Sequence, residues 1–188
     1  MEKIPLVLMF GPQASGKSSF IKMNNLENYT ISADKIRINL NGFTISDGHK
    51  QIKFNPNSEP VVWQIFDLML KTRLAQGLPT VVDNTNLGGG RVNPMQAILD
   101  LVPENYQVYL VDCFEPLLDR DAPLSEASLV RALRILSKRN RDREYSVDLA
   151  IIERFVDYYA QFELPAGVIK LSSSDAEQLQ DLIGQIIQ

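Results

Sequence analysis

The chain has 188 residues, of which 45% are hydrophobic and 22% are charged, and its formal net charge at pH 7 is −4. This length and apolar content are enough for one hydrophobic core, so we expect a single domain over residues 1–188. The acidic balance argues against a protein that coats nucleic acid by bulk electrostatic attraction, and no apolar stretch is long and unbroken enough to predict a membrane span.

Strand and helix patterns alternate from the start of the chain. The apolar run 4–10 predicts a strand that is buried on both faces, and a glycine-containing turn separates it from a helix expected at 17–24. A second strand is expected at 29–32 and a short helix at 34–40. The segment 43–57 is polar and has no clear period, so we expect a loop there.

The rest of the chain continues this alternation. Further strands are expected at 79–83, 106–112 and 168–171, and helices at 58–76, 93–102 and 125–138, with two more beginning at Ser146 and Ser174. Five strands separated by helices favour right-handed crossovers and a parallel sheet with helices on both faces. The predicted fold class is therefore α/β, with ligands at the carboxyl ends of the strands.

The turn after the first strand fits the phosphate-binding pattern G-x-x-x-x-G-K-[ST]. Its residues are Gly11, Pro12, Gln13, Ala14, Ser15, Gly16, Lys17 and Ser18, and Ser19 follows them. Glycines let the backbone turn its N–H groups toward phosphate oxygens, and the next helix adds the positive end of its dipole. Lys17 is expected to reach the β and γ phosphates, and the Ser18 hydroxyl to bind Mg²⁺. We therefore predict a P-loop NTPase fold that binds ATP.

Asp34 and Arg37 lie three residues apart on the short helix after the second strand, so they share one face of it. In one interpretation, Asp34 takes the proton of an acceptor hydroxyl while Arg37 holds an anionic part of the same acceptor. In the other, Asp34 satisfies N–H groups at the start of the helix and forms an ordinary surface ion pair with Arg37. The spacing alone does not decide between them.

A polar run ends the third strand. It consists of Asp83, Asn84, Thr85 and Asn86. Asp83 resembles the acid that supports Mg²⁺ in P-loop enzymes through a bound water, although an aspartate that opens a turn is the alternative. We expect the three residues after it to bind the acceptor. Gly88, Gly89 and Gly90 would allow close backbone approach beside them.

One segment is strongly cationic although the chain is acidic. Its basic residues are Arg131, Arg134, Lys138, Arg139, Arg141 and Arg143. Such a run is commonly a solvated helix face. The phosphate-binding loop favours a functional interpretation, because a polyphosphate needs cations from more than one direction. We expect this segment to form a helical lid over about residues 125–147.

Other residues are weaker candidates. Asp112 and Glu115 close the fourth strand, whereas His49 is expected to be solvated. Cys113 is expected to be a small buried apolar residue rather than a nucleophile, because no histidine lies near it in the sequence. It is the only cysteine and cannot form an internal disulfide, and no signal-peptide pattern precedes the first strand, which together favour a cytoplasmic location.

Four segments in this order resemble the P-loop kinases of the polynucleotide 5′-hydroxyl kinase type and, more broadly, zeta-toxin-like and AAA_33-like P-loop kinases. They are 11–18, 32–37, 82–86 and 139–143. The resemblance implies a five-stranded parallel sheet like that of nucleoside-monophosphate kinases, a mobile helical lid, ATP as phosphate donor and Mg²⁺ as cofactor.

The resemblance also implies roles for the matching residues. In that family the residue matching Asp34 is the general base on the 5′-hydroxyl, and the one matching Arg37 holds the phosphate on the 3′ side of the acceptor. The nucleotide and Mg²⁺ are bound by the residues that match Lys17, Ser18, Arg139 and Arg143, the last two being paired arginines of the lid.

We therefore expect an ATP-dependent kinase whose acceptor is the 5′-hydroxyl of a nucleic acid or nucleotide. Two alternatives remain open. One is a kinase for a small metabolite or antibiotic, since related kinases with this layout phosphorylate small molecules. The other is a nucleotide-dependent switch without an acceptor, which would leave the Asp34/Arg37 pair and the cationic lid without a purpose.

Overall fold

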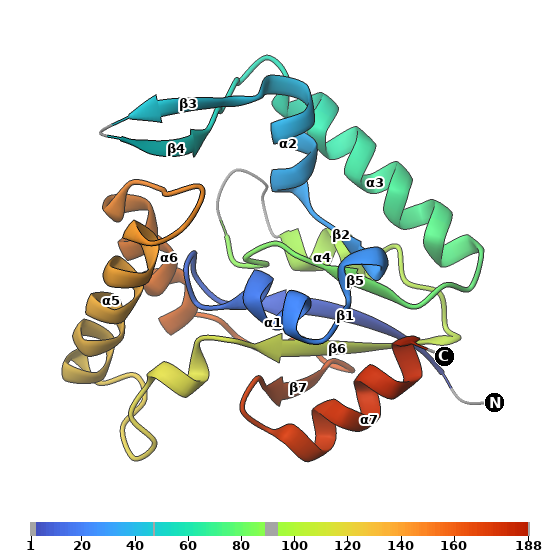
Figure 1. The fold of residues 1–188 in the computed structure, drawn as a ribbon. Helices are drawn as coiled ribbons and strands as arrows, with labels where there is room; N and C mark the ends of the chain where they lie inside the picture. Colours follow the sequence, from blue (N-terminus) through green and yellow to red (C-terminus); the bar gives the residue numbers. More distant parts are fainter. Residues whose placement is uncertain (1–2, 47, 89–93, 188) are drawn as a thin grey trace.

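The computed structural model describes residues 3–46, 48–88 and 94–187 (Figure 1). Its strands are β1 (Ile4–Phe10), β2 (Thr30–Ile31), β3 (Phe43–Ser46), β4 (His49–Ile52), β5 (Thr80–Val82), β6 (Tyr106–Asp112) and β7 (Ile169–Ser172). Its α-helices are α1 (Lys17–Met23), α2 (Ala33–Asn41), α3 (Glu59–Ala75), α4 (Pro94–Leu99), α5 (Glu126–Arg141), α6 (Leu149–Ala160) and α7 (Ala176–Ile187). Short 3₁₀ turns lie at Glu27–Tyr29 and Glu115–Leu117.

Five strands form one parallel sheet in the order β2-β5-β1-β6-β7, which confirms the predicted fold class. β1 is the central strand and pairs with β6 along its whole length, from Ile4 opposite Tyr106 to Phe10 opposite Asp112. The next two strands of the sheet in sequence lie on one side of β1, and the last two lie on the other. This reversal makes the carboxyl end of β1 the point where such sheets bind ligands.

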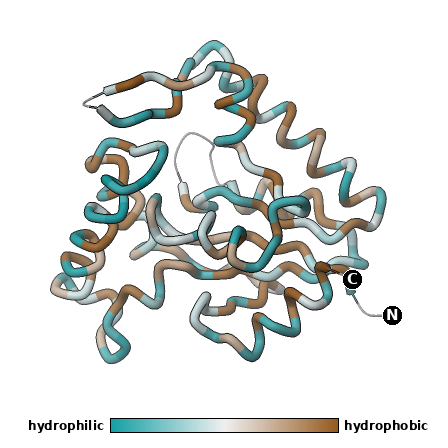
Figure 2. Tube along the Cα trace, in the orientation of Figure 1, coloured by the Kyte–Doolittle hydropathy of each residue, from teal (hydrophilic) through white to brown (hydrophobic). Residues whose placement is uncertain are grey.

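Helices cover both faces of the sheet (Figure 1). Leu6, Leu8 and Phe10 belong to a core that includes the buried sides of α3, α4, α5 and α6. Val7 and Met9 point the other way, into a core with α1 and α7. Hydrophobic residues follow one another along the central strands, whereas along the outer helices they alternate with hydrophilic ones (Figure 2). The turn that leaves β1 therefore starts from a strand that is packed on both faces.

The prediction of a loop at 43–57 is wrong, because β3 and β4 form an antiparallel hairpin in this segment. All four residues of β3 are exposed and none of the four in β4 is fully buried. Phe43 and Ile45 alternate with Thr44 and Ser46, but the alternation covers only four residues and β4 does not continue it, so the segment as a whole shows no clear period. Gly42 (φ 71°) and Gly48 (φ 77°) supply left-handed backbone at its base and at its turn. The hairpin lies beside the loop that follows α5 (Figure 1), and His49 is exposed on it, as expected.

The predicted lid corresponds to α5 and the loop after it, and α5 continues to Arg141, three residues past the expected end. Asn93, expected to begin the helix at 93–102, lies outside the described residues, as do Gly89 and Gly90; α4 covers Pro94–Leu99. Across the described ranges, no helix combines the length and apolar character needed to cross a bilayer.

Candidate active site

The turn between β1 and α1 has the geometry of a phosphate-binding loop. Gly11 and Gly16 have φ of 125° and 116°, values that favour glycine. A Cβ on Gly11 would lie 2.9 Å from Ser15 Oγ, so a side chain there would force the loop open. The Lys17 ammonium donates hydrogen bonds to Gly11 O (2.8 Å) and Pro12 O (2.7 Å). The remaining predicted nucleotide-binding residues lie in this turn or the first turn of α1, namely Gln13, Ala14, Ser18 and Ser19.

Ser18 and Asp83 form a pair that fits a magnesium ion. The Ser18 hydroxyl donates a hydrogen bond to Asp83 Oδ2 (3.0 Å), which joins the first turn of α1 to the end of β5. Burial raises the pKa of Asp83, an effect that the Lys17 charge and the Ser18 hydrogen bond partly offset. Both side chains offer oxygen, which Mg²⁺ prefers, and this ion commonly completes its shell with phosphate oxygens and water. These two residues would therefore hold Mg²⁺, and the role of Asp83 through a bound water stays a prediction.

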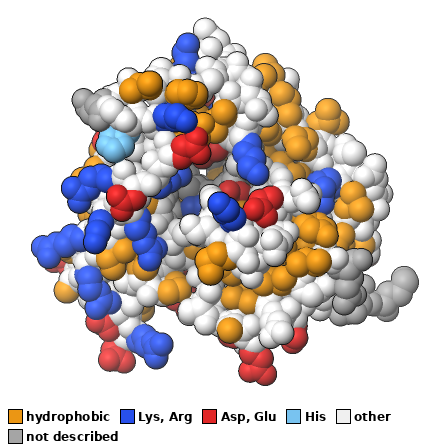
Figure 3. All heavy atoms as spheres, viewed as in Figure 1, with side chains coloured by type: hydrophobic (Ala, Val, Ile, Leu, Met, Phe, Trp, Pro, Cys, Tyr) orange, Lys and Arg blue, Asp and Glu red, His pale blue; other side chains and the backbone are white. Residues whose placement is uncertain are grey.

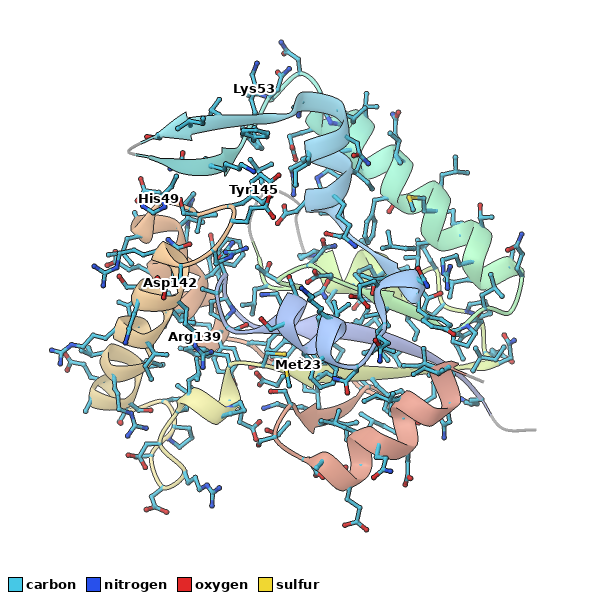
Figure 4. All side chains as sticks on the ribbon, viewed as in Figure 1. Met23, His49, Lys53, Arg139, Asp142 and Tyr145 are labelled. Carbon is cyan, nitrogen blue, oxygen red and sulfur yellow. The ribbon has the colours of Figure 1, made fainter. Side chains whose placement is uncertain are left out.

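Two arginines of the lid reach toward the phosphate-binding loop. Arg139, labelled in Figure 4, donates from Nη1 to Ser15 O (3.2 Å). Arg143 has a buried Nη1 with no hydrogen-bond partner among the residues described. Burial lowers the pKa of Arg143, and the carboxylates of Asp34 and Asp83 partly offset that effect. A buried N–H without an acceptor is unfavourable, so this guanidinium fits an anionic ligand such as a phosphate oxygen.

On the acceptor side, Arg37 is held between two carboxylates. Its Nη1 donates to Asp34 Oδ1 (2.8 Å), and its Nε and Nη2 donate to the two carboxylate oxygens of Glu59 (2.8 and 2.9 Å). The guanidinium also lies 5.5 Å from the centre of the Trp63 ring. Burial would lower the pKa of Arg37, but the Glu59 hydrogen bonds and both carboxylate charges outweigh it and raise the pKa. Arg37 is thus a fixed cation that orients Asp34, whose side chain remains 55% exposed.

Sequence reasoning missed Glu59. It is the first residue of α3 and lies 22 residues after Arg37 along the chain. An acidic residue at a helix start is common for reasons of helix stability, so nothing in its local pattern distinguishes it. Only the packing of α2 against α3 brings it to Arg37.

The charged groups from four elements converge at the carboxyl edge of the sheet. The charge of Asp34, on α2, contributes to the pKa shifts of Lys17, Asp83 and Arg143. The Lys17 pKa itself is lowered, chiefly by burial, and the Asp83 charge partly offsets this. Figure 3 shows a hollow in the middle of this face with basic and acidic side chains on its walls, and further basic side chains over α5. A phosphate donor and a hydroxyl acceptor could therefore meet here.

The polar run after Asp83 mainly joins the strand ends. Asn84 Oδ1 accepts a hydrogen bond from the Ala33 N–H (3.2 Å) at the start of α2. The Gly11 N–H donates to Thr85 O (3.3 Å). Asn86 is 2% exposed, has φ 54°, and donates from Nδ2 to Met9 O (2.7 Å). The predicted acceptor role does not fit Asn86, because its side chain turns inward toward β1.

We expect Asn86→Ala to lower the free energy of unfolding by about 1–3 kcal/mol, because the Met9 carbonyl would lose its partner in a buried place. Urea unfolding would measure this, with the exposed Asn57→Ala as a control that should unfold like the wild type. A raised acceptor KM with unchanged stability would instead support the acceptor role.

The contacts of Asp112 indicate a structural role. Its Oδ1 accepts hydrogen bonds from the N–H groups of Phe114 (2.9 Å) and Glu115 (3.0 Å). Its Oδ2 accepts from the Tyr159 hydroxyl (2.7 Å) and lies 3.1 Å from Lys170 Nζ. The carboxylate is fully buried and ties β6, β7 and α6 together.

Cys113 should react slowly with alkylating agents in the folded protein. It is buried, and burial raises the pKa of its thiol to about 11. At pH 8 only about one such thiol in a thousand is the reactive thiolate. Iodoacetamide labelling followed by mass spectrometry should therefore be slow in buffer and fast in denaturant. Equal rates in both would show that the thiol is accessible and ionised in the fold.

Comparison with known proteins agrees with this geometry. The sequence profile of the AAA_33 family, described as an AAA domain, matches residues 6–122. No curated protein matches the chain in sequence. A proposed kinase from Chloroflexus aurantiacus j-10-fl has a similar structure, with a TM-score of 0.52 at 14% identity over 100% of this chain and 98% of that one. A gluconokinase from Sinorhizobium meliloti 1021 has a TM-score of 0.50 at 13% identity over 100% and 94%.

A chain in the structure of a Pnkp1/Rnl/Hen1 complex has a TM-score of 0.46 at 16% identity over 60% of this chain, which spans only 36% of that one. At such identities the two full-length likenesses show the fold alone, which is a kinase-like P-loop fold. The family match is stronger, because it covers more than half of the chain and includes the phosphate-binding loop, Asp34 and Asp83. The chain therefore belongs to the AAA_33 family of P-loop proteins.

Proposed function

We propose that this protein is a kinase that transfers the γ-phosphate of ATP to a hydroxyl, specifically the 5′-hydroxyl of a polynucleotide or nucleotide. The observation that supports it best is the convergence of Asp34 with Lys17, Asp83 and Arg143. A nucleotide switch needs the loop and the metal-binding pair, but it has no use for a carboxylate held beside them by the half-buried ion pair of Arg37 with Glu59.

In this reaction the acceptor oxygen forms a bond to the γ-phosphorus as the bond from that phosphorus to the bridging oxygen of ADP breaks. Asp34 takes the proton of the acceptor hydroxyl, and Arg37 keeps the carboxylate oriented. Lys17, the loop N–H groups, Arg139 and Arg143 stabilise the charge on the phosphate oxygens. Mg²⁺ bound by Ser18 and Asp83 would supply further positive charge to those oxygens.

The contacts of Arg37 favour a second candidate, a kinase for a small neutral alcohol. One guanidinium and the carboxylates of Asp34 and Glu59 sum to a charge of −1. Such a group attracts an acceptor phosphate weakly, in contrast to the role that the resemblance implies for Arg37. A sugar or polyol hydroxyl would meet no such repulsion.

An acceptor screen tests these functions. The purified protein is given labelled ATP with Mg²⁺ and one of three acceptors: a 5′-hydroxyl oligonucleotide, a nucleoside 3′-phosphate, or a panel of neutral sugars and alcohols. Labelled oligonucleotide or nucleotide would support the first function, and a labelled alcohol alone would support the second. ATP binding with slow hydrolysis and no labelled acceptor would contradict both and favour the switch.

A further inference from the structure

The hairpin β3–β4 and the loop after α5 are far apart in sequence but are joined by an isolated β-bridge. The Ser146 N–H donates to Lys50 O (2.9 Å), and Lys50 and Tyr145 form a parallel bridge. Tyr145, labelled in Figure 4, lies between the hairpin and α5. Ser146 is buried, so water does not readily replace this hydrogen bond.

The Lys50 side chain strengthens the same junction. Its ammonium lies 5.0 Å from the centre of the Phe43 ring and 5.7 Å from that of Tyr145, and the two rings meet edge to face at 6.0 Å. It also lies 3.1 Å from Glu144 Oε1. A single cation therefore binds an aromatic residue of the hairpin and two residues of the lid loop.

The lid loop is also closed at its base. The buried Asn140, near the end of α5, donates from Nδ2 to Val147 O (2.8 Å) and accepts from the Val147 N–H at Oδ1 (3.1 Å). One side chain thus satisfies both main-chain groups of a residue seven positions later. Arg143 lies inside the loop that Asn140 closes, two residues before the bridge to Lys50.

These contacts do not serve the hydrophobic core. Among the residues described, none of β3 or β4 belongs to either core or packs against it. The hairpin instead begins immediately after α2, which carries Asp34, and ends against the loop that carries Arg143. It therefore links the predicted base on the acceptor side to the predicted phosphate-binding arginine on the donor side.

We propose that the junction of Phe43, Lys50, Tyr145 and Ser146 is a latch that sets the position of Arg143, with Lys50 and Asn140 as positioning residues for phosphoryl transfer. The proposal rests on the proposed function, because it assigns to the latch an effect on the transfer step. The side chains of Lys50 and Asn140 contact only the hairpin and the lid loop in the interactions given above, so each acts through the backbone on either side of Arg143.

Lys50→Met tests the latch, because it removes the cation and keeps most of the side chain. A small displacement of a transition-state group can lower a rate by about 10²-fold, so we expect a loss of that order in kcat with little change in ATP affinity. Lys50→Arg should restore most of kcat, because it keeps the charge over both rings. The matched control is Lys53→Met, which removes an exposed cation directly after β4 and should behave like the wild type.

The double variant with Arg143→Ala decides whether Lys50 acts through Arg143. If it does, Lys50→Met adds no further loss once Arg143 is absent. Multiplied losses in the double variant, or wild-type kcat in Lys50→Met, would overturn the proposal.

Amide hydrogen exchange gives a readout that does not depend on activity. The Ser146 amide should exchange faster in Lys50→Met than in Lys53→Met or the wild type. In Asn140→Ala, the amides around Ser146 should exchange faster still. Unchanged protection in both variants would overturn the latch. If the wild type phosphorylates no acceptor, the proposed function fails while this measurement still decides whether the latch exists.

Discussion

Replacing Arg143 by alanine should lower kcat for phosphoryl transfer by about 10³-fold or more, the size expected for a transition-state arginine. The guanidinium is buried, lacks a hydrogen-bond acceptor at Nη1, and lies near Asp34 and Asp83. Under the proposed function, the transferred phosphoryl group would supply the missing acceptor. Steady-state kinetics with the acceptor found in the screen would measure the loss, and thermal unfolding would check that the fold is intact.

Arg134→Ala is the matched control for this experiment. It removes the same charge from α5 but at an exposed position outside the lid loop. If both variants lose activity to the same extent, the effect comes from the general charge of the lid. Near-normal activity of Arg143→Ala would refute its assignment to the phosphates.

Asp34→Asn should retain ATP affinity and lose about 10²- to 10⁴-fold in transfer rate, because an amide cannot take the proton of the acceptor hydroxyl. The asparagine oxygen can still accept the hydrogen bond from Arg37, so the geometry of the pair should persist. Calorimetry with ATP and Mg²⁺ would measure the affinity, and single-turnover kinetics would measure the transfer. Transfer at the wild-type rate would show that Asp34 is not the base.

The phosphate-binding loop and the sheet could be predicted because their signals are local. The loop needs glycine at two strained positions and a lysine and a serine at fixed offsets, and a strand buried on both faces needs an unbroken apolar run such as 4–10. Each of these requirements restricts residues that are close together in the sequence, so a short pattern detects it. The same locality explains why Asp83, directly after a buried strand, could be singled out.

The failures have the opposite cause. Glu59 belongs to the site only because α3 packs against α2, a contact that no short pattern encodes. The described residues of the hairpin add nothing to either core, and β4 pairs with the distant loop after α5, a contact that no short pattern encodes. Asn86 follows a strand just as Asp83 does, and only its left-handed backbone, which turns the amide inward, separates a structural role from a binding one.

The Lys17 ammonium has three N–H groups, and two of them already point at carbonyl oxygens of its own loop. Only the third remains free to meet an incoming triphosphate. The loop itself therefore restrains the four-carbon stem, which leaves little rotational freedom of this long side chain to be lost when a nucleotide binds. Selectivity among anions then depends on whether an anion can place one oxygen in line with this third N–H group. An anion of the same total charge but another shape does not meet this requirement.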